Sequence, residues 1–252
     1  MSEQLPTSKV PILTNKRFIE GRPESTQEVI ELTKGIYELK AINPEIIGAS
    51  LFGSVLKGTA TEKSDYDTNV FVDADRLSKL GIAVTVDNKN DAKLVDETLK
   101  KEYSHYIGDY LGKKLGKDHT LIEGGIFIVP LSEKLIVYQL EQYFRAVKLK
   151  VEYREAKEQW YEGNMYGQEP EEPEYPMMGW NIGTLFGAEL TSGLEGYRQL
   201  VLDELQQAGQ AGEDAWNDIM FFVKFGEGHL DDKYYPSTVD EAINEYGARK
   251  VA

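Results

Sequence analysis

The sequence contains no cysteine, which excludes disulfide bonds, catalysis by a thiol and metal sites with thiolate ligands. Histidine is also scarce, since only His105, His119 and His229 are present, and we do not expect a histidine-rich metal site. No apolar run reaches the roughly 18 residues that a membrane-spanning helix requires. The N-terminal segment MSEQLPTSKVPILTNKRF lacks the apolar stretch of a signal peptide. We therefore expect a cytoplasmic protein with no transmembrane helix.

Basic residues are outnumbered by acidic ones, 28 to 43, and the formal net charge is −15. This balance disfavours binding to a long nucleic-acid backbone, because such binding usually depends on a basic surface. It favours a cationic partner, or a small substrate whose phosphates arrive neutralised by Mg²⁺. The chain has 252 residues, 41% of them hydrophobic, which is enough to build a substantial core.

The order of hydrophobic patterns predicts an α+β protein. A small mixed sheet flanked by helices is expected over residues 1–132, as a catalytic domain, and a helical domain over residues 133–252. We expect strands over 46–52, 67–73, 82–86 and 121–131, the last interrupted at Gly124-Gly125. We expect a first helix that starts near Pro23 or Ser25 and stops at Asn43-Pro44, and further helices over 91–115, 133–160, 180–208, 213–225 and 238–247. Gly116 is the expected end of the second helix, because glycine commonly closes a helix in the left-handed conformation.

Two aspartates, Asp65 and Asp67, are separated by one residue at the start of a predicted strand. Side chains alternate across a strand, so both carboxylates are expected on the same face. Two oxygen ligands on one face suit Mg²⁺, which binds to one or two carboxylates together with substrate phosphates. A third carboxylate nearby would permit a second ion and in-line displacement at phosphorus.

Glycine and serine end the preceding strand, at Gly53 and Ser54. The glycine lets the backbone approach a ligand closely, and the serine with the following N–H groups is suited to binding a triphosphate. The small polar loop that follows adds further candidate nucleotide-binding residues, namely Lys57, Gly58 and Ser64. One element thus offers phosphate donors, and the adjacent strand offers metal ligands.

The segment Leu51-Phe52-Gly53-Ser54, followed by Gly58 and then Ser64-Asp65-Tyr66-Asp67, resembles the signature of the DNA polymerase beta-type nucleotidyltransferase superfamily. The resemblance implies that Gly53 and Ser54 contact an incoming triphosphate, and that Asp65 and Asp67 bind metal ions. It also implies a third acidic residue on a later strand. Glu123 is the first candidate for this third metal ligand, which would also help to deprotonate the acceptor, and Asp87 is the alternative.

The activity implied by this resemblance is Mg²⁺-dependent transfer of a nucleoside monophosphate from a nucleoside triphosphate such as ATP to an acceptor hydroxyl, with two metal ions. Members of similar size modify small antibiotics such as aminoglycosides, whereas others modify proteins, act as toxins or extend RNA ends. The net charge and the acidic segment 169–174 favour a cationic small molecule. A protein or tRNA acceptor, and a non-catalytic nucleotide-binding module, are the alternatives.

Overall fold

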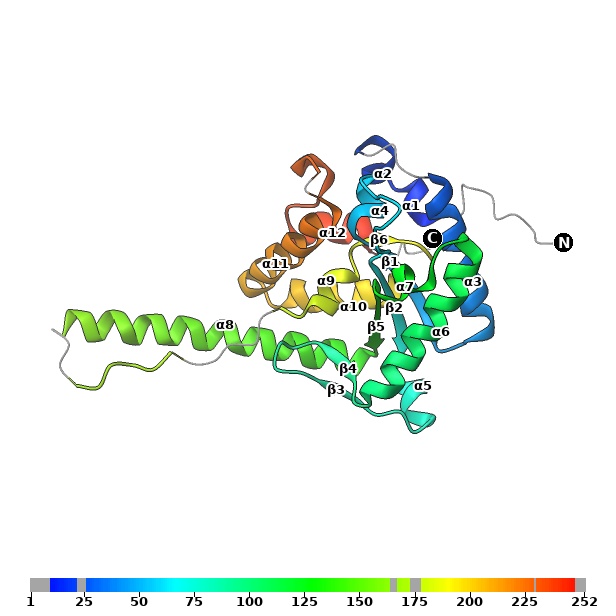
Figure 1. Ribbon diagram of the computed structural model, residues 1–252. Helices are drawn as coiled ribbons and strands as arrows, with labels where there is room; N and C mark the ends of the chain where they lie inside the picture. The colour runs from blue at the N-terminus through cyan, green and yellow to red at the C-terminus, as the bar shows by residue number, and fades with distance from the viewer. Residues whose placement is uncertain (1–9, 22–25, 164–166, 173–177, 229, 248–252) are drawn as a thin grey trace, which may run out of the picture.

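Helices and strands alternate in the first half of the chain, and helices dominate the second half (Figure 1). The computed structural model describes residues 10–21, 26–163, 167–172, 178–228 and 230–247. The first half contains α1 (Pro11–Thr14), α2 (Lys16–Gly21), α3 (Thr26–Ile42), β1 (Ile46–Leu51), α4 (Gly53–Lys57), β2 (Thr68–Asp73), α5 (Ala74–Lys79), β3 (Val84–Val86), β4 (Ala92–Leu94), α6 (Glu97–Leu115), α7 (His119–Glu123) and β5 (Ile126–Leu131). The second half contains α8 (Glu133–Glu162), α9 (Trp180–Thr184), β6 (Ala188–Glu189), α10 (Glu195–Gln207), α11 (Gln210–Glu227), the 3-10 helix η2 (Asp232–Tyr234) and α12 (Val239–Tyr246).

The central sheet has four strands in the order β5-β2-β1-β6. β1 runs antiparallel to both β2 and β6, whereas β2 and β5 are parallel. A separate hairpin is formed by β3 and β4. The sheet is therefore mixed, and together with the flanking helices it confirms the predicted α+β class. Among the described residues, no helix combines the length and the apolar character needed to cross a membrane.

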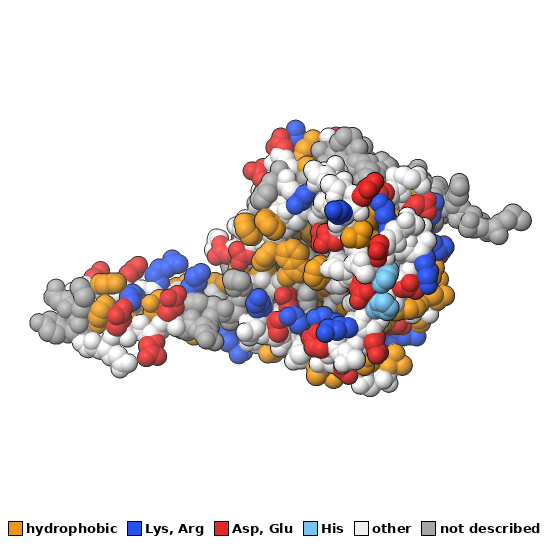
Figure 2. Space-filling model, in the orientation of Figure 1, with side chains coloured by type: hydrophobic (Ala, Val, Ile, Leu, Met, Phe, Trp, Pro, Cys, Tyr) orange, Lys and Arg blue, Asp and Glu red, His pale blue; other side chains and the backbone are white. Residues whose placement is uncertain are grey.

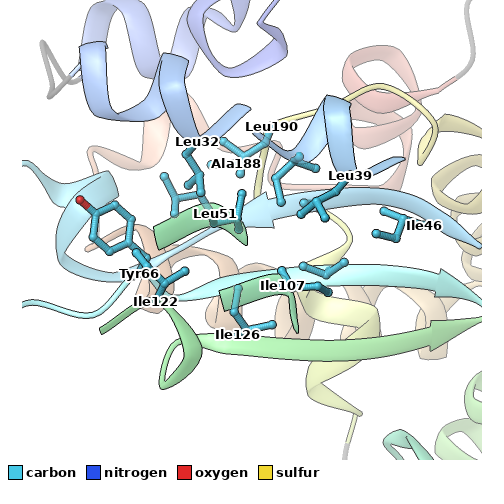
Figure 3. Close-up of a cluster of buried hydrophobic side chains, with 14 of the residues drawn as sticks. Leu32, Leu39, Ile46, Leu51, Tyr66, Ile107, Ile122, Ile126, Ala188 and Leu190 are labelled. Carbon is cyan, nitrogen blue, oxygen red and sulfur yellow. The ribbon is translucent and has the colours of Figure 1, made fainter. Parts of the chain in front are cut away.

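The sheet is buried on both faces, as the burial of five of the six residues of β2 shows. On one face, Val70 and Val72 join a core with side chains of α3, α6 and α7, shown in Figure 3. On the other face, Phe71 joins a second core formed with α8 to α12. Because successive side chains of a strand point to opposite faces, Asp67 and Asn69 share the face of Phe71.

The polypeptide departs from the predicted elements near β4 and α7. The helix predicted over 91–115 begins only at Glu97, because Asp96 caps it by accepting hydrogen bonds from the N–H groups of Thr98 and Leu99. Residues 92–94 pair with β3 instead. The predicted helix end at Gly116 is confirmed, with φ 63° and an N–H that donates to the Gly112 carbonyl.

The strand predicted over 121–131 is wrong in its first part. Asp118 caps α7 by accepting a hydrogen bond from the Thr120 N–H, and β5 begins only at Ile126. Glu123 consequently lies at the end of a helix and not on a strand. Similarly, β2 begins at Thr68, so Asp65 and Asp67 lie in the segment immediately before the strand.

The second half of the chain adds to the sheet built by the first half. α8 begins directly after the predicted boundary at residue 132, and Figure 1 shows that its far end extends well beyond the body of the molecule. The segment 180–208, predicted as helical, contains β6 between α9 and α10, and β6 pairs with β1. Both halves therefore contribute to one sheet, and the division into domains at residue 132 stays a prediction.

Candidate functional site

The turn after β1 brings the start of α4 against Asp67. Phe52 is extended, and Gly53 has φ 73°, a left-handed conformation that side-chain-bearing residues rarely adopt. A Cβ at Gly53 would lie only 2.7 Å from Cγ of Asp67, closer than ordinary van der Waals contact. Gly53 is thus required twice, by its backbone conformation and by the carboxylate that lies against it.

Alternation of side chains separates the two aspartates from the residue between them. Tyr66 is 2% exposed and belongs to the core that includes side chains of α3 and α7 (Figure 3), whereas Asp65 is exposed and Asp67 is half-buried. The Tyr66 ring therefore anchors this segment, and the aspartates stay outside the core. The backbone is held on both sides, because the Phe52 N–H donates to the Asp67 carbonyl (2.8 Å) and the Thr68 N–H donates to the Gly125 carbonyl (2.7 Å).

The environment of Asp67 is suited to receiving a cation. Burial raises the pKa of its carboxyl group above the ordinary value, the negative charge of Asp65 raises it further, and Lys57 opposes both effects. Two carboxylates with this mutual repulsion are a donor set that fits Mg²⁺. A divalent ion between them would relieve the repulsion that their proximity creates.

A pocket of about 440 Å³ opens beside Asp67, between the sheet and the helices of the second half. Its polar lining residues are Lys57, Asp67 and Asn69. The rest of the lining is mainly aromatic and comes from both halves of the chain: Phe52, Gly53, Phe127, Trp180, Phe225 and Gly226. The pocket thus combines a carboxylate and an ammonium group with aromatic surfaces, as ligand sites commonly do.

Three buried polar atoms near Asp67 have no hydrogen-bond partner among the described residues. They are Oγ of Ser54, Oγ1 of Thr68 and Oδ1 of Asn69. Buried polar groups are nearly always satisfied in folded proteins, so each such atom calls for an explanation. Asn69 lines the pocket and is placed to interact with a polar ligand, whereas Ser54 follows Gly53 in the turn and is not among the residues that line the pocket.

Gly58 and Ser64 shape the loop but do not line this pocket. Gly58 ends α4 with φ 66°, and its N–H donates to carbonyls of that helix. Ser64 Oγ accepts a hydrogen bond from the Thr61 N–H (2.8 Å), which closes the turn before Asp65. Their observed contacts position the loop between Gly53 and Asp67.

The two candidates for a third carboxylate lie elsewhere. Oε2 of Glu123 is 2.9 Å from Nδ1 of His105, and Glu123 lines a different hollow on the surface of α6 and α7. Asp87 closes the turn between β3 and β4, where Oδ1 accepts from the N–H groups of Lys89 and Asp91. Burial by itself would raise the pKa of the Asp87 carboxyl group. Hydrogen bonds from Lys93 and from these N–H groups outweigh burial, so the pKa of Asp87 is lowered.

An aromatic residue stands where β5 reaches the pocket. In the parallel register of β2 and β5, Phe127 is the partner of Asn69, two residues after Asp67. Its side chain is 49% exposed although both neighbours in the strand are buried.

Within the described part of the chain, no third acidic or histidine side chain groups with Asp65 and Asp67 around a possible metal position.

Five pocket residues lie outside the motif and were not predicted. Asn69 and Phe127 lie on strands whose register was not predicted, whereas Trp180, Phe225 and Gly226 come from distant helices. The local signal was Asn69, a polar residue next to the apolar run 70–72 of β2 that is itself 1% exposed. A buried amide in such a strand indicates a specific polar role.

Comparison with known proteins supports the same region. Residues 32–147 match the family described as nucleotidyltransferase domain. This match contains β1, the turn at Gly53, both aspartates and β5. A search of curated protein sequences and a search of solved structures each gave no match.

Proposed function

We propose that this chain, whose residues 32–147 form a nucleotidyltransferase domain, transfers a nucleoside monophosphate from a nucleoside triphosphate to an acceptor hydroxyl. The domain family identifies the protein as a transferase enzyme. In the transfer, the acceptor oxygen bonds to the α-phosphorus, the bond to the β-phosphate oxygen breaks, pyrophosphate leaves and the hydroxyl proton is released. The observation that carries the proposal is the contact of the Gly53 turn with Asp67 at the mouth of a pocket.

The residues between Gly53 and Asp67 have distinct roles in the proposed transfer. Asp65 and Asp67 hold Mg²⁺, which neutralises phosphate charge when bound. Ser54 donates its hydroxyl to a phosphate oxygen, which satisfies its buried Oγ. Lys57 supplies a positive charge at the pocket wall. Gly58 and Ser64 keep the loop in the shape that presents these groups.

The nucleobase or the acceptor occupies the aromatic part of the pocket. Phe127, Trp180 and Phe225 present ring surfaces there, and base–aromatic stacking contributes about 1–3 kcal/mol per base. Ring faces also attract organic cations. Together with the net charge of −15, these surfaces favour a cationic small molecule, such as an aminoglycoside, as the acceptor.

The acidic segment 169–174 fits this acceptor class. Glu171 and Glu172 are exposed, and residues 173 and 174 lie outside the described part of the chain. Lys157 pairs with Glu169, so that glutamate is already neutralised. A tRNA or protein acceptor is the competing candidate, and it requires a larger contact surface than the pocket offers.

The direct test is pyrophosphate release from each of the four nucleoside triphosphates with Mg²⁺, across a panel of acceptors. Asp65→Asn and Asp67→Asn are expected to lose at least about a hundredfold in rate, since each removes a carboxylate ligand of the Mg²⁺ that would neutralise the phosphate charge. Asp75→Asn is the matched control, because Asp75 is an exposed aspartate on α5. Nucleotide binding without turnover for any acceptor would instead identify a non-catalytic module.

Acceptor classes are separated by the dependence of turnover on salt. A tRNA acceptor predicts a steep fall in affinity with rising salt, because counterions are released from the phosphate backbone. An aminoglycoside predicts a product with one added nucleoside monophosphate, which mass spectrometry detects. Turnover with tRNA or protein alone contradicts the small-molecule proposal.

A further inference from the structure

Two histidines and a glutamate that do not line the pocket converge on the surface. His105 belongs to α6, whereas His119 and Glu123 are the first and last residues of α7. One ligand atom from each residue lies within 4.8 Å of the other two. The two imidazole rings are 5.5 Å apart in an edge-to-face arrangement, and Figure 2 shows the described histidines side by side at the surface. No local pattern in the sequence predicts this convergence.

The packing of α7 directly on α6 produces the cluster. A Cβ at Gly108 would lie 2.9 Å from Cα of Glu123, and one at Gly112 would lie 3.1 Å from Cα of His119. Only glycines at these two positions allow the backbones to approach so closely. His119 and Glu123 are four residues apart and share one face of α7, while His105 precedes Gly108 by one turn of α6.

The chemistry of these donors differs from that of the two aspartates. Imidazole nitrogen suits Zn²⁺ and neighbouring transition metals, whereas Mg²⁺ prefers oxygen and retains its water. Two histidines and one glutamate are a known ligand set for Zn²⁺, with a further position open to water. With bonds of about 2.0–2.2 Å, tetrahedral ligands are about 3.3–3.6 Å apart, so the observed 4.8 Å limit requires only small side-chain rotations.

The side chains are free to make these rotations. His105 is 58% exposed and His119 47% exposed, and neither is held in a core. We propose that His105, His119 and Glu123 form a binding site for Zn²⁺ or a similar divalent transition-metal ion, separate from the Mg²⁺ site. Glu123 then acts here and not as the third ligand beside Asp67. The alternative is a surface ion pair between His105 and Glu123 with no metal.

An ion at this site would link α7 to α6 close to the segment that bears Asp67. Gly125 follows α7 after one residue, and a Cβ on it would lie 2.6 Å from the backbone of Tyr66. The Gly125 carbonyl also accepts the N–H of Thr68. The site is thus placed to stabilise the end of α7 and the start of β5, which form one side of the Asp67 segment.

The test uses untagged, chelator-treated protein titrated with Zn²⁺ in a calorimeter, followed by thermal unfolding. We expect one ion per chain and a Tm increase of about 5–10 °C when free Zn²⁺ is about a hundred times its Kd. His105→Ala, His119→Ala and Glu123→Gln should each weaken binding at least about tenfold, as loss of a metal ligand does. Glu141→Gln, at an exposed position of α8, is the matched control and should bind as the wild type does.

Two results would overturn the proposal. One is undiminished Zn²⁺ affinity in the double variant His105→Ala/His119→Ala, which would place any bound ion elsewhere. The other is an absence of Zn²⁺-induced shifts in the histidine ring resonances of the wild-type protein, a measurement that does not depend on variants that fold. Zn²⁺ affinity should persist in excess Mg²⁺ and in Asp65→Asn/Asp67→Asn, so failure of this site and failure of nucleotidyl transfer are distinguishable.

Discussion

Replacing Gly53 by alanine tests two requirements at this position, the left-handed backbone conformation and the space occupied by the Asp67 carboxylate. Alanine in the left-handed region costs about 1–2 kcal/mol, which lowers Tm by about 2–8 °C in a chain of this size. The added Cβ also meets Asp67, with its carboxyl carbon at 2.7 Å. The carboxylate must retreat by roughly 1 Å to reach ordinary contact distance, and a displacement of that size can reduce the rate about a hundredfold.

Gly81→Ala is the matched control for this experiment. Gly81 has φ 81°, and a Cβ there would meet nothing within 4 Å. Both variants should therefore lose similar stability from the backbone, but only Gly53→Ala should lose pyrophosphate release. Tm is measured by thermal unfolding, and kcat/KM by coupled detection of pyrophosphate. A Gly53→Ala enzyme with the activity of Gly81→Ala would refute the assignment of Asp67 to the site.

Three further predictions follow from the charged residues. The raised pKa of Asp67 means that the folded state holds its proton more tightly than the unfolded state, so stability falls as pH rises from the ordinary aspartate pKa through the folded one. Asp67→Asn should therefore be more stable than wild type at neutral pH without Mg²⁺. Denaturant unfolding should show that this difference in stability disappears in acid, where Asp67 is protonated. A gain in stability that persists in acid would contradict the raised pKa as its cause. Lys57→Ala should raise the KM for the nucleoside triphosphate about tenfold or more, as expected for a lost charged hydrogen bond, while Lys63→Ala should leave it near wild type. Arg17→Ala should cost about 3–5 kcal/mol in urea unfolding, because it leaves Glu227 buried without the guanidinium 3.0 Å away; a loss below about 1 kcal/mol would contradict this account.

Features encoded within short stretches could be predicted from the sequence. The turn at Gly53, the pair Asp65 and Asp67, the helix end at Gly116 and the α+β class all depend on neighbouring residues or on periodicity along one element. The start of β2 was predicted one residue early, so the two aspartates lie immediately before the strand and not on it. Asp96 and Asp118 cap α6 and α7, and these local signals were overlooked in the prediction. Because Asp118 starts α7, Glu123 lies on a helix and not on the predicted strand.

Only the tertiary structure decided which distant residues meet the local ones. The register between β2 and β5 places Phe127 beside the pocket, and the helices of the second half supply Trp180 and Phe225. The close packing of α6 and α7 likewise joins His105 to Glu123. By itself, the sequence determined a glycine-serine turn and two carboxylates, because their geometry is set by the backbone over a few residues. The other pocket walls and the histidine cluster depend on packing between elements far apart in the chain, and no local pattern specifies that packing.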